Sequence, residues 1–140
     1  MGSTTIDDTS KPLILVVDDF LDSREMYGTY LEFAGYRVAL AADGHDALAK
    51  AFELLPDAVL LDMSLPGIDG WEVTRRLKQA DATREIPVIA VSGHALREHS
   101  DNAKVCGADV FVAKPCLPEV VTDEIRRALT KSKTTFKLPR

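Results

Sequence analysis

The sequence has little that would indicate a metal–thiolate centre, a disulfide-bonded secreted domain or a membrane protein. Its two cysteines, Cys106 and Cys116, lack the spacing of metal ligands, so we expect both to be reduced thiols. No apolar stretch is long enough to span a membrane. No basic start followed by an apolar segment indicates a secretory signal, and we therefore expect a cytoplasmic protein.

Positive charge is outnumbered by negative charge. The 140 residues include 17 Lys and Arg against 22 Asp and Glu, which gives a formal net charge of -5. This balance argues against nonspecific nucleic-acid binding over the whole surface, and we expect no direct DNA binding. The hydrophobic fraction of 46%, in contrast, is ample for the core of one domain of ordinary size.

Short apolar runs alternate along the chain with stretches of helical periodicity. The runs have the length of strands and cover residues 13–17, 36–41, 58–61, 88–91 and 110–113. A helical stretch follows each of them, five in all. This alternation predicts an α/β fold with a five-stranded parallel sheet, helices on both faces and right-handed crossovers.

Apolar residues at helical spacing define one face of several of these helices. They are Met26, Tyr30 and Phe33 in the first helix, Leu48, Phe52 and Leu55 in the second, and Val121, Ile125 and Leu129 in the last. The helix expected over 96–106 is polar. We interpret residues 1–11 as a disordered leader, 12–131 as the domain and 132–140 as a basic tail.

Polar residues stand at the carboxyl ends of four of the five strands. Asp18 and Asp19 follow the first strand, and Asp62 ends the third. Ser92 follows the fourth strand and Lys114 the fifth. In a parallel sheet these ends share one edge, where open α/β sheets bind their ligands. We therefore expect the five side chains to meet in one pocket.

Three carboxylates in one pocket repel each other, so either one is protonated or a cation neutralises them. No His or Cys falls at these strand ends, and oxygen ligands suit Mg²⁺, which shares phosphate oxygens with its substrates. Lys114 offers a compact charge for phosphate and Ser92 a hydrogen-bond donor. Because an Asp can form an aspartyl phosphate, the pattern favours phosphoryl transfer.

With these residues in this order, the sequence resembles a response-regulator receiver domain of two-component signalling. The resemblance is carried by VVDD at 16–19, LDMSLPGIDG at 61–70, VSG at 91–93 and FVAKP at 111–115. It extends over about residues 11–130. It implies a doubly wound, flavodoxin-like (βα)5 fold with the strand order 2-1-3-4-5.

The resemblance also implies the roles of the acidic residues. Asp62 matches the phosphoacceptor. Asp19 matches a direct Mg²⁺ ligand, and Asp18 matches its acidic partner, which often acts through water. Asp62 and the backbone carbonyl of Ser64 match the remaining protein ligands of the metal.

Four further positions match the phosphate-binding and switch residues of receiver domains. Ser92 matches the hydroxyl that turns toward the phosphoryl group, and Lys114 matches its salt-bridge partner. The peptide bond from Lys114 to Pro115 should be cis. Phe111 matches the switch aromatic, which moves inward when Ser92 engages the phosphate.

Two side chains beside the phosphoacceptor are candidates for setting the lifetime of the phosphoryl group. Ser64 lies two residues after Asp62, and His94 lies two residues after Ser92. Our hypothesis is that they orient or block the attacking water.

Plainer interpretations stay open for each of these residues. The Asp18–Asp19 pair also fits a helix N-cap with a first-turn acid, and Ser92 fits a turn. Lys114 also fits a solvated lysine and Phe111 a core residue. Two other classes of function compete: a hydrolase with an aspartyl nucleophile, and a binding module that has lost phosphorylation. Ser64 argues against the hydrolase, because that family has an acid at this position.

The function we expect is that of a stand-alone receiver, a phosphoacceptor domain that assists its own phosphorylation and dephosphorylation. A histidine kinase or a histidine phosphotransfer protein would supply the phosphoryl group. The signal would pass to a downstream protein through a face built from the helix over 96–106, the fifth strand and the last helix. We expect a monomer or a weak dimer.

Overall fold

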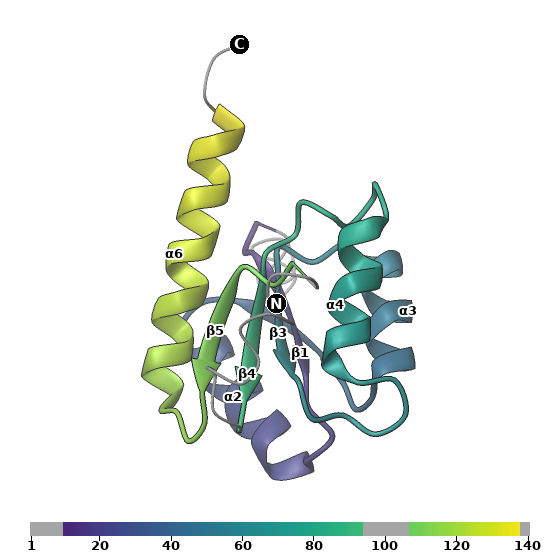
Figure 1. Cartoon of the computed structure of the whole chain (residues 1–140). Coiled ribbons are helices and arrows are strands. Elements are labelled where there is room, and N and C mark those ends of the chain that lie inside the picture. The colour runs from purple at the N-terminus through teal and green to yellow at the C-terminus, as the bar shows by residue number, and fades with distance from the viewer. Residues whose placement is uncertain (1–9, 94–106, 138–140) are drawn as a thin grey trace, which may run out of the picture.

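The computed structural model describes residues 10–93 and 107–137, with side chains up to residue 131. Its elements are β1 (Leu13–Val17), α2 (Leu21–Phe33), β2 (Arg37–Ala41), α3 (Gly44–Leu54), β3 (Ala58–Asp62), α4 (Gly70–Gln79), β4 (Val88–Ser92), β5 (Val110–Ala113) and α6 (Pro118–Lys137). The strands form one central sheet with helices on both faces (Figure 1). The helix expected over 96–106 lies outside the described residues, as does Cys106.

The sheet confirms the predicted topology. Its five strands are all parallel, in the order β2-β1-β3-β4-β5. Val17 lies opposite Leu61, and one residue further on Asp62 lies opposite Val91. The carboxyl ends of the strands therefore meet at one edge, which is the lower edge of the sheet in Figure 1.

The core has two layers, one on each face of the sheet. Residues of α2 and α6 pack on one face, and residues of α3 and α4 pack on the other. Strands β3 and β4 are buried along their whole length, as expected of apolar runs that do not alternate with polar residues. The central strands are thus held from both sides, and Asp62 ends one of them.

Helix α2 packs through a different face from the one its apolar spacing indicated. Tyr27 and Leu31 are buried against the sheet, whereas Met26 is 42% exposed and Phe33 is 93% exposed. Gly28 explains the choice, because a Cβ there would lie 3.2 Å from a side-chain carbon of Leu40. A glycine lets the helix lie close to β2 on this side, so the Met26 face is turned to solvent.

Helix α3 differs from expectation in a similar way. It begins at Gly44 after Asp43, whose side chain accepts a hydrogen bond from the backbone N–H of Asp46. Leu48 is buried as expected, but Phe52 and Leu55 are exposed. The small side chains of the helix face the sheet: its buried residues are Gly44, Ala47, Leu48 and Ala51.

Helix α6 begins at Pro118 and buries Val121 and Ile125. It continues to Lys137 and extends beyond the sheet (Figure 1). Part of the predicted basic tail is therefore helical, while the boundaries of the leader, domain and tail stay predictions. None of the helices in the described part of the chain is both long enough and apolar enough to cross a membrane.

Candidate functional site

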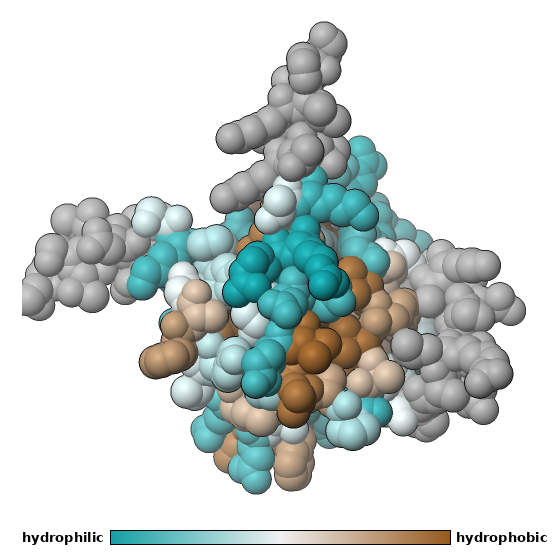
Figure 2. All heavy atoms as spheres, turned by 90° about the vertical axis from the view of Figure 1, so that its left-hand side faces the viewer, coloured by the Kyte–Doolittle hydropathy of each residue, from teal (hydrophilic) through white to brown (hydrophobic). Residues whose placement is uncertain are grey.

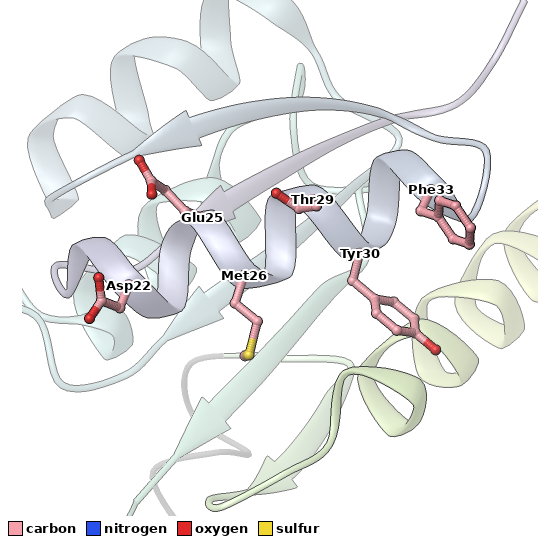
Figure 3. A pocket seen from close by; sticks show the side chains of 6 residues that line it. All are labelled: Asp22, Glu25, Met26, Thr29, Tyr30 and Phe33. Atoms are coloured by element: carbon pink, nitrogen blue, oxygen red, sulfur yellow. The ribbon is translucent and has the colours of Figure 1, made fainter.

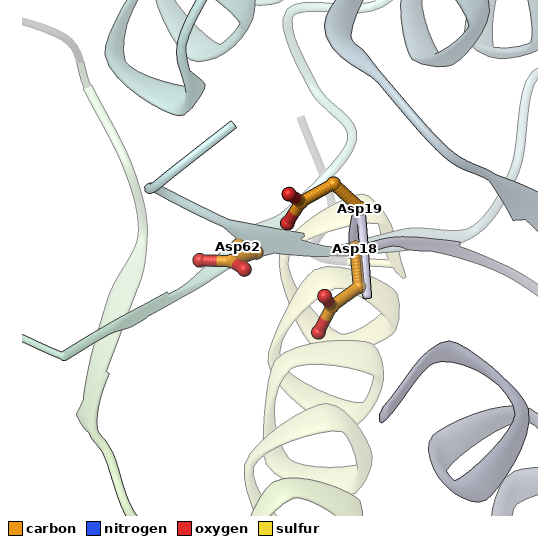
Figure 4. A group of neighbouring side chains, drawn as sticks. All are labelled: Asp18, Asp19 and Asp62. Carbon is orange, nitrogen blue, oxygen red and sulfur yellow. The ribbon is translucent and has the colours of Figure 1, made fainter. Parts of the chain in front are cut away.

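Three carboxylates meet at the carboxyl edge of the sheet, as the sequence predicted. Asp18 and Asp19 follow β1, and Asp62 ends β3. One oxygen from each lies within 4.8 Å of the other two, and the three side chains point to the same side of the strand ends (Figure 4). This spacing suits a single hard cation bound by oxygen ligands.

Asp62 is almost fully buried. Only 4% of the residue is exposed. Oδ1 accepts a hydrogen bond from the backbone N–H of Ser64 at 2.9 Å. Oδ2 accepts one from Lys114 Nζ at 3.1 Å. Lys114 reaches Asp62 from the far side of β4, so it is not simply a solvated lysine: it pairs with the candidate phosphoacceptor.

Asp18 carries a charge that the folded chain does not neutralise well. It is buried, and its Oδ1 accepts a hydrogen bond from the backbone N–H of Phe20 at 2.9 Å. Burial raises the pKa of Asp18 above its ordinary value, and the negative charges of Asp62 and Asp19 act in the same direction. The Phe20 hydrogen bond and Lys114 oppose them. A bound divalent cation would relieve this conflict, so the residues fit Mg²⁺.

The alternative role of the acidic pair as a helix cap is not seen. Helix α2 has Phe20 at its N-cap position, with no side-chain hydrogen bond to the first turn. Asp18 bonds the backbone of the connecting loop, and Asp19 is exposed. Neither carboxylate caps α2, and both belong to the three-carboxylate site.

Ser92 and Lys114 are brought together by strand pairing. Ser92 lies opposite Ala113, and its carbonyl accepts the backbone N–H of Lys114 at 2.8 Å. Ser92 is buried. The Lys114–Pro115 peptide bond is cis, which confirms that prediction. The sheet register therefore places a hydroxyl and an ammonium group on the side of Asp62 that faces β4 and β5.

The loop after Asp62 is fixed by two glycines. Gly67 has a φ of +74°, a left-handed conformation that favours glycine. Gly70 starts α4 directly against the site, since a Cβ there would lie 2.6 Å from the Cα of Met63 and 2.8 Å from the carbonyl oxygen of Asp62. Asp69 caps the helix by accepting the backbone N–H of Glu72 at 3.0 Å. The first turn of α4 is thereby held against the phosphoacceptor segment.

The remaining predicted residues are placed less directly. Phe111 is half-buried on β5 and its ring contacts that of Trp71, so packing is shown and a switch role stays a prediction. Ser64 is exposed beside Asp62. The use of its carbonyl as a metal ligand also stays a prediction. His94 lies outside the described residues.

Sequence reasoning missed an apolar rim beside the site. Phe20, Leu21 and Leu117 are all exposed, Phe20 to 61% and Leu117 to 63%. Each follows a site residue within three positions: Phe20 and Leu21 come after Asp19, and Leu117 after Lys114. On the side of the molecule that carries α6, apolar surface gathers in the lower half of the view (Figure 2). The available signal in the sequence was that each of these apolar residues comes one to three positions after a predicted site residue.

The solvent face of α2 carries an open groove (Figure 3). It has a volume of about 500 Å³ and is lined by Asp22, Glu25, Met26, Thr29, Tyr30 and Phe33. These include the three apolar residues whose spacing predicted the helix. Exposed apolar side chains that gather on one helix face are suited to contact with another protein.

The fold and this site define the class of protein. A parallel sheet in the order 2-1-3-4-5 carries three carboxylates, a buried serine and a lysine at one edge. The family described as response regulator receiver domain matches residues 14–126, and the chain belongs to this family. Receiver domains accept phosphoryl groups in two-component signalling, bind Mg²⁺ in an acidic pocket, and interact with histidine kinases or phosphotransfer proteins and with downstream targets.

Several regulators are similar to this chain. It is 34% identical over 119 residues to the phosphate regulon transcriptional regulatory protein PhoB of Pseudomonas aeruginosa. This match covers 85% of this chain and 52% of PhoB. It is 38% identical over 125 residues to the response regulator PleD of Caulobacter vibrioides, 26% of whose length is matched. The chain thus spans about half of PhoB and about a quarter of PleD. With the polar-differentiation response regulator DivK of Brucella anthropi it shares 33% identity over 102 residues, 73% of this chain and 83% of DivK.

Solved structures agree with the fold. A CheY-like receiver domain protein from Methanospirillum hungatei JF-1 superposes with a TM-score of 0.83 at 29% identity, covering 89% of this chain and 98% of that one. The receiver domain of the sensor histidine kinase PA1611 from Pseudomonas aeruginosa PAO1 gives a TM-score of 0.79 at 31% identity, with 86% and 98% covered. That structure has a magnesium ion coordinated in its active-site cleft.

Proposed function

We propose that this chain acts as a stand-alone receiver whose Asp62 accepts a phosphoryl group from a phosphohistidine of a histidine kinase or a histidine phosphotransfer protein. The observation that carries the proposal is the buried Asp62 carboxylate, held by the Ser64 N–H and Lys114 Nζ beside two further carboxylates. The similarity to the response regulator DivK, of which the match covers 83%, supports the proposal. We place it in the cytoplasm as a monomer or weak dimer.

The transfer step follows from these contacts. One carboxylate oxygen of Asp62 attacks the phosphorus in line, the bond from phosphorus to the imidazole nitrogen breaks, and the electron pair stays on the imidazole. Lys114 Nζ, already 3.1 Å from Asp62 Oδ2, pairs with a phosphoryl oxygen, and the Ser92 hydroxyl donates to another. Mg²⁺ held by Asp18, Asp19, Asp62 and the Ser64 carbonyl would supply charge neutralisation for these oxygens.

The output of this step is a changed protein-binding face. Engagement of Ser92 and Lys114 by the phosphoryl group pulls on the ends of β4 and β5, and Phe111 moves with them. The proposed face comprises β5, α6 and the helix expected over 96–106. The net charge of -5 supports a protein target and not DNA. Ser64 and His94 set the phosphoryl lifetime, which Ser64→Ala and His94→Ala would test through the dephosphorylation rate.

The apolar rim supports docking of the phosphodonor next to Asp62. A donor histidine must come within bonding distance of a carboxylate that is almost fully buried, so the donor protein has to cover the exposed residues around it. Phe20, Leu21 and Leu117 supply apolar contact area for this encounter.

The proposal is tested by incubating the chain with a small acyl phosphate and Mg²⁺ and measuring its intact mass. Wild type should gain one phosphoryl group, and Asp62→Asn should gain none. Asp46→Asn, which changes an exposed carboxylate on α3, is the matched control and should behave as wild type. A wild type that binds Mg²⁺ but gains no mass would favour the binding module that has lost phosphorylation.

A further inference from the structure

Trp71 of α4 contacts Phe111 of β5 through its ring. The ring centroids lie 5.6 Å apart and the ring planes are inclined by 31°, which is a favourable aromatic arrangement. Both side chains are half-buried and both pack on the core layer that α3 and α4 form. We infer that Trp71 is a positioning residue for Phe111, and that it couples the aromatic of β5 to the phosphoacceptor through the first turn of α4.

The backbone next to Trp71 is in direct contact with the phosphoacceptor segment. A Cβ on Gly70 would lie 2.8 Å from the carbonyl oxygen of Asp62, and the N–H of Gly70 donates to the carbonyl of Met63 at 3.3 Å. Because packed backbone segments move together, a shift at the end of β3 displaces the start of α4. Trp71 is the first residue that carries this displacement away from the site.

Phe111 is tied to the same site by strand register. It lies opposite Ala90, just as Ala113 lies opposite Ser92. Side chains two residues apart on a strand point to the same face, so Phe111 and Ser92 share one side of the sheet. Lys114 comes three residues after Phe111, directly after the end of β5, and pairs with Asp62. The Trp71–Phe111 contact therefore closes a ring of contacts that begins and ends at Asp62.

Because of this closed ring of contacts, the Trp71–Phe111 contact affects the site and does more than fill the core. The position of Phe111 depends on the α4 side of the site through Trp71 and on the β5 side through Lys114. Loss of the indole removes one of these two constraints. An aromatic contact of this kind biases an equilibrium between two positions by about two- to tenfold. The inference rests on the proposed function, because the phosphoryl group supplies the displacement.

Trp71 is the single tryptophan of the chain, so its fluorescence reports on this contact. The test is a titration with beryllofluoride, a phosphoryl mimic, in the presence of Mg²⁺, with anion binding followed independently by ¹⁹F NMR. The wild-type emission should change in step with anion binding. At saturating beryllofluoride, Phe111→Leu should show less than half of the wild-type emission change. Phe52→Leu, which alters an exposed aromatic on α3, should respond as wild type.

A second measurement separates positioning from mere stability. A fluorinated phenylalanine at position 111 reports by ¹⁹F NMR on the inward and outward positions of this ring. The ratio of the two populations should change by about two- to tenfold in Trp71→Leu. It should return to the wild-type ratio in Trp71→Phe, which restores an aromatic ring. Bound beryllofluoride with an equal emission change in wild type and Phe111→Leu would overturn the role of Trp71 and leave the phosphoacceptor role intact. Absence of anion binding in wild type would overturn the proposed function, and this inference with it.

Discussion

Replacing Gly70 by alanine tests how tightly the start of α4 is seated on the phosphoacceptor segment. In an open helix the exchange stabilises a protein by about 0.5–1 kcal/mol. Here the new methyl group would lie 2.6 Å from the Cα of Met63 and 2.8 Å from the carbonyl oxygen of Asp62. Both neighbours are backbone atoms that cannot turn aside. Overpacking of this kind costs about 1–3 kcal/mol, so we expect a net loss of about 1–2 kcal/mol.

Gly28→Ala is the matched control for this prediction. Gly28 also lies within a helix, but its nearest neighbour would be a side-chain carbon of Leu40 at 3.2 Å. That side chain can shift by a few tenths of an ångström, so the overpacking cost and the helix gain should nearly cancel, within about 0.5 kcal/mol.

Urea unfolding of Gly70→Ala, Gly28→Ala and wild type measures the difference. We expect Gly70→Ala to lose the most stability, and to be phosphorylated more slowly by a small acyl phosphate, because the displaced backbone carries Asp62. A Gly70→Ala protein that is at least as stable as Gly28→Ala would refute the close seating of α4.

Three further changes have distinct expected outcomes. Lys78→Met should lower the free energy of unfolding, measured by urea titration, by about 1–3 kcal/mol. The reason is that Lys78 Nζ donates to Asp109 and to two backbone carbonyls. The control, Arg84→Met, loses an exposed ion pair and should change the free energy of unfolding by less than about 0.5 kcal/mol. Asp18→Asn should raise the melting temperature without Mg²⁺ at neutral pH and abolish stabilisation by Mg²⁺. Leu117→Asp should slow transfer from a phosphohistidine protein, while labelling by a small acyl phosphate stays unchanged.

The pH dependence expected for Asp18 follows from the sign of its pKa shift. The pKa is raised in the folded chain, so the folded state holds this proton more strongly than the unfolded state does. The associated stability is present below the unfolded pKa and is lost as the pH rises through the folded pKa. Wild type without Mg²⁺ should therefore gain melting temperature as the pH is lowered from 7 toward the raised pKa. Asp18→Asn should lack this component, and equal profiles would contradict the raised pKa.

The topology and the site were predictable because their signals are local. Unalternating apolar runs marked β3 and β4, and each ended in a residue of the site, Asp62 or Ser92. A parallel sheet has to bring such ends to one edge. Lys114, which precedes the cis bond to Pro115, follows the last strand and therefore reaches the same edge. The chemistry of the site could therefore be inferred before any contact was known.

The packed faces of the helices were not predictable in the same way. Helix α2 has apolar residues on two faces, and periodicity alone does not say which one meets the sheet. Gly28 decides it, since it lets α2 approach Leu40. The spacing of Phe52 in α3 and Leu55 at its C-cap misled for a similar reason. Ala47 and Ala51 are buried instead and form the packed surface of α3.

Contacts between distant elements were also beyond the sequence. The rings of Trp71 and Phe111 meet because both side chains pack on the same core layer. The two residues are 40 positions apart in the sequence, so no local pattern signals this contact. The length of α6 was missed because its last turns reach beyond the sheet, where no apolar stripe is required.

The central claim is that Asp62, and neither of the two neighbouring aspartates, receives the phosphoryl group. The most direct test is to phosphorylate the chain with a small acyl phosphate and Mg²⁺, reduce the aspartyl phosphate with borohydride, and locate the resulting homoserine by peptide mass spectrometry. We predict homoserine at position 62 alone, dependent on Mg²⁺. Homoserine at position 18 or 19, or an unmodified position 62 in protein that has gained phosphoryl mass, would contradict the account.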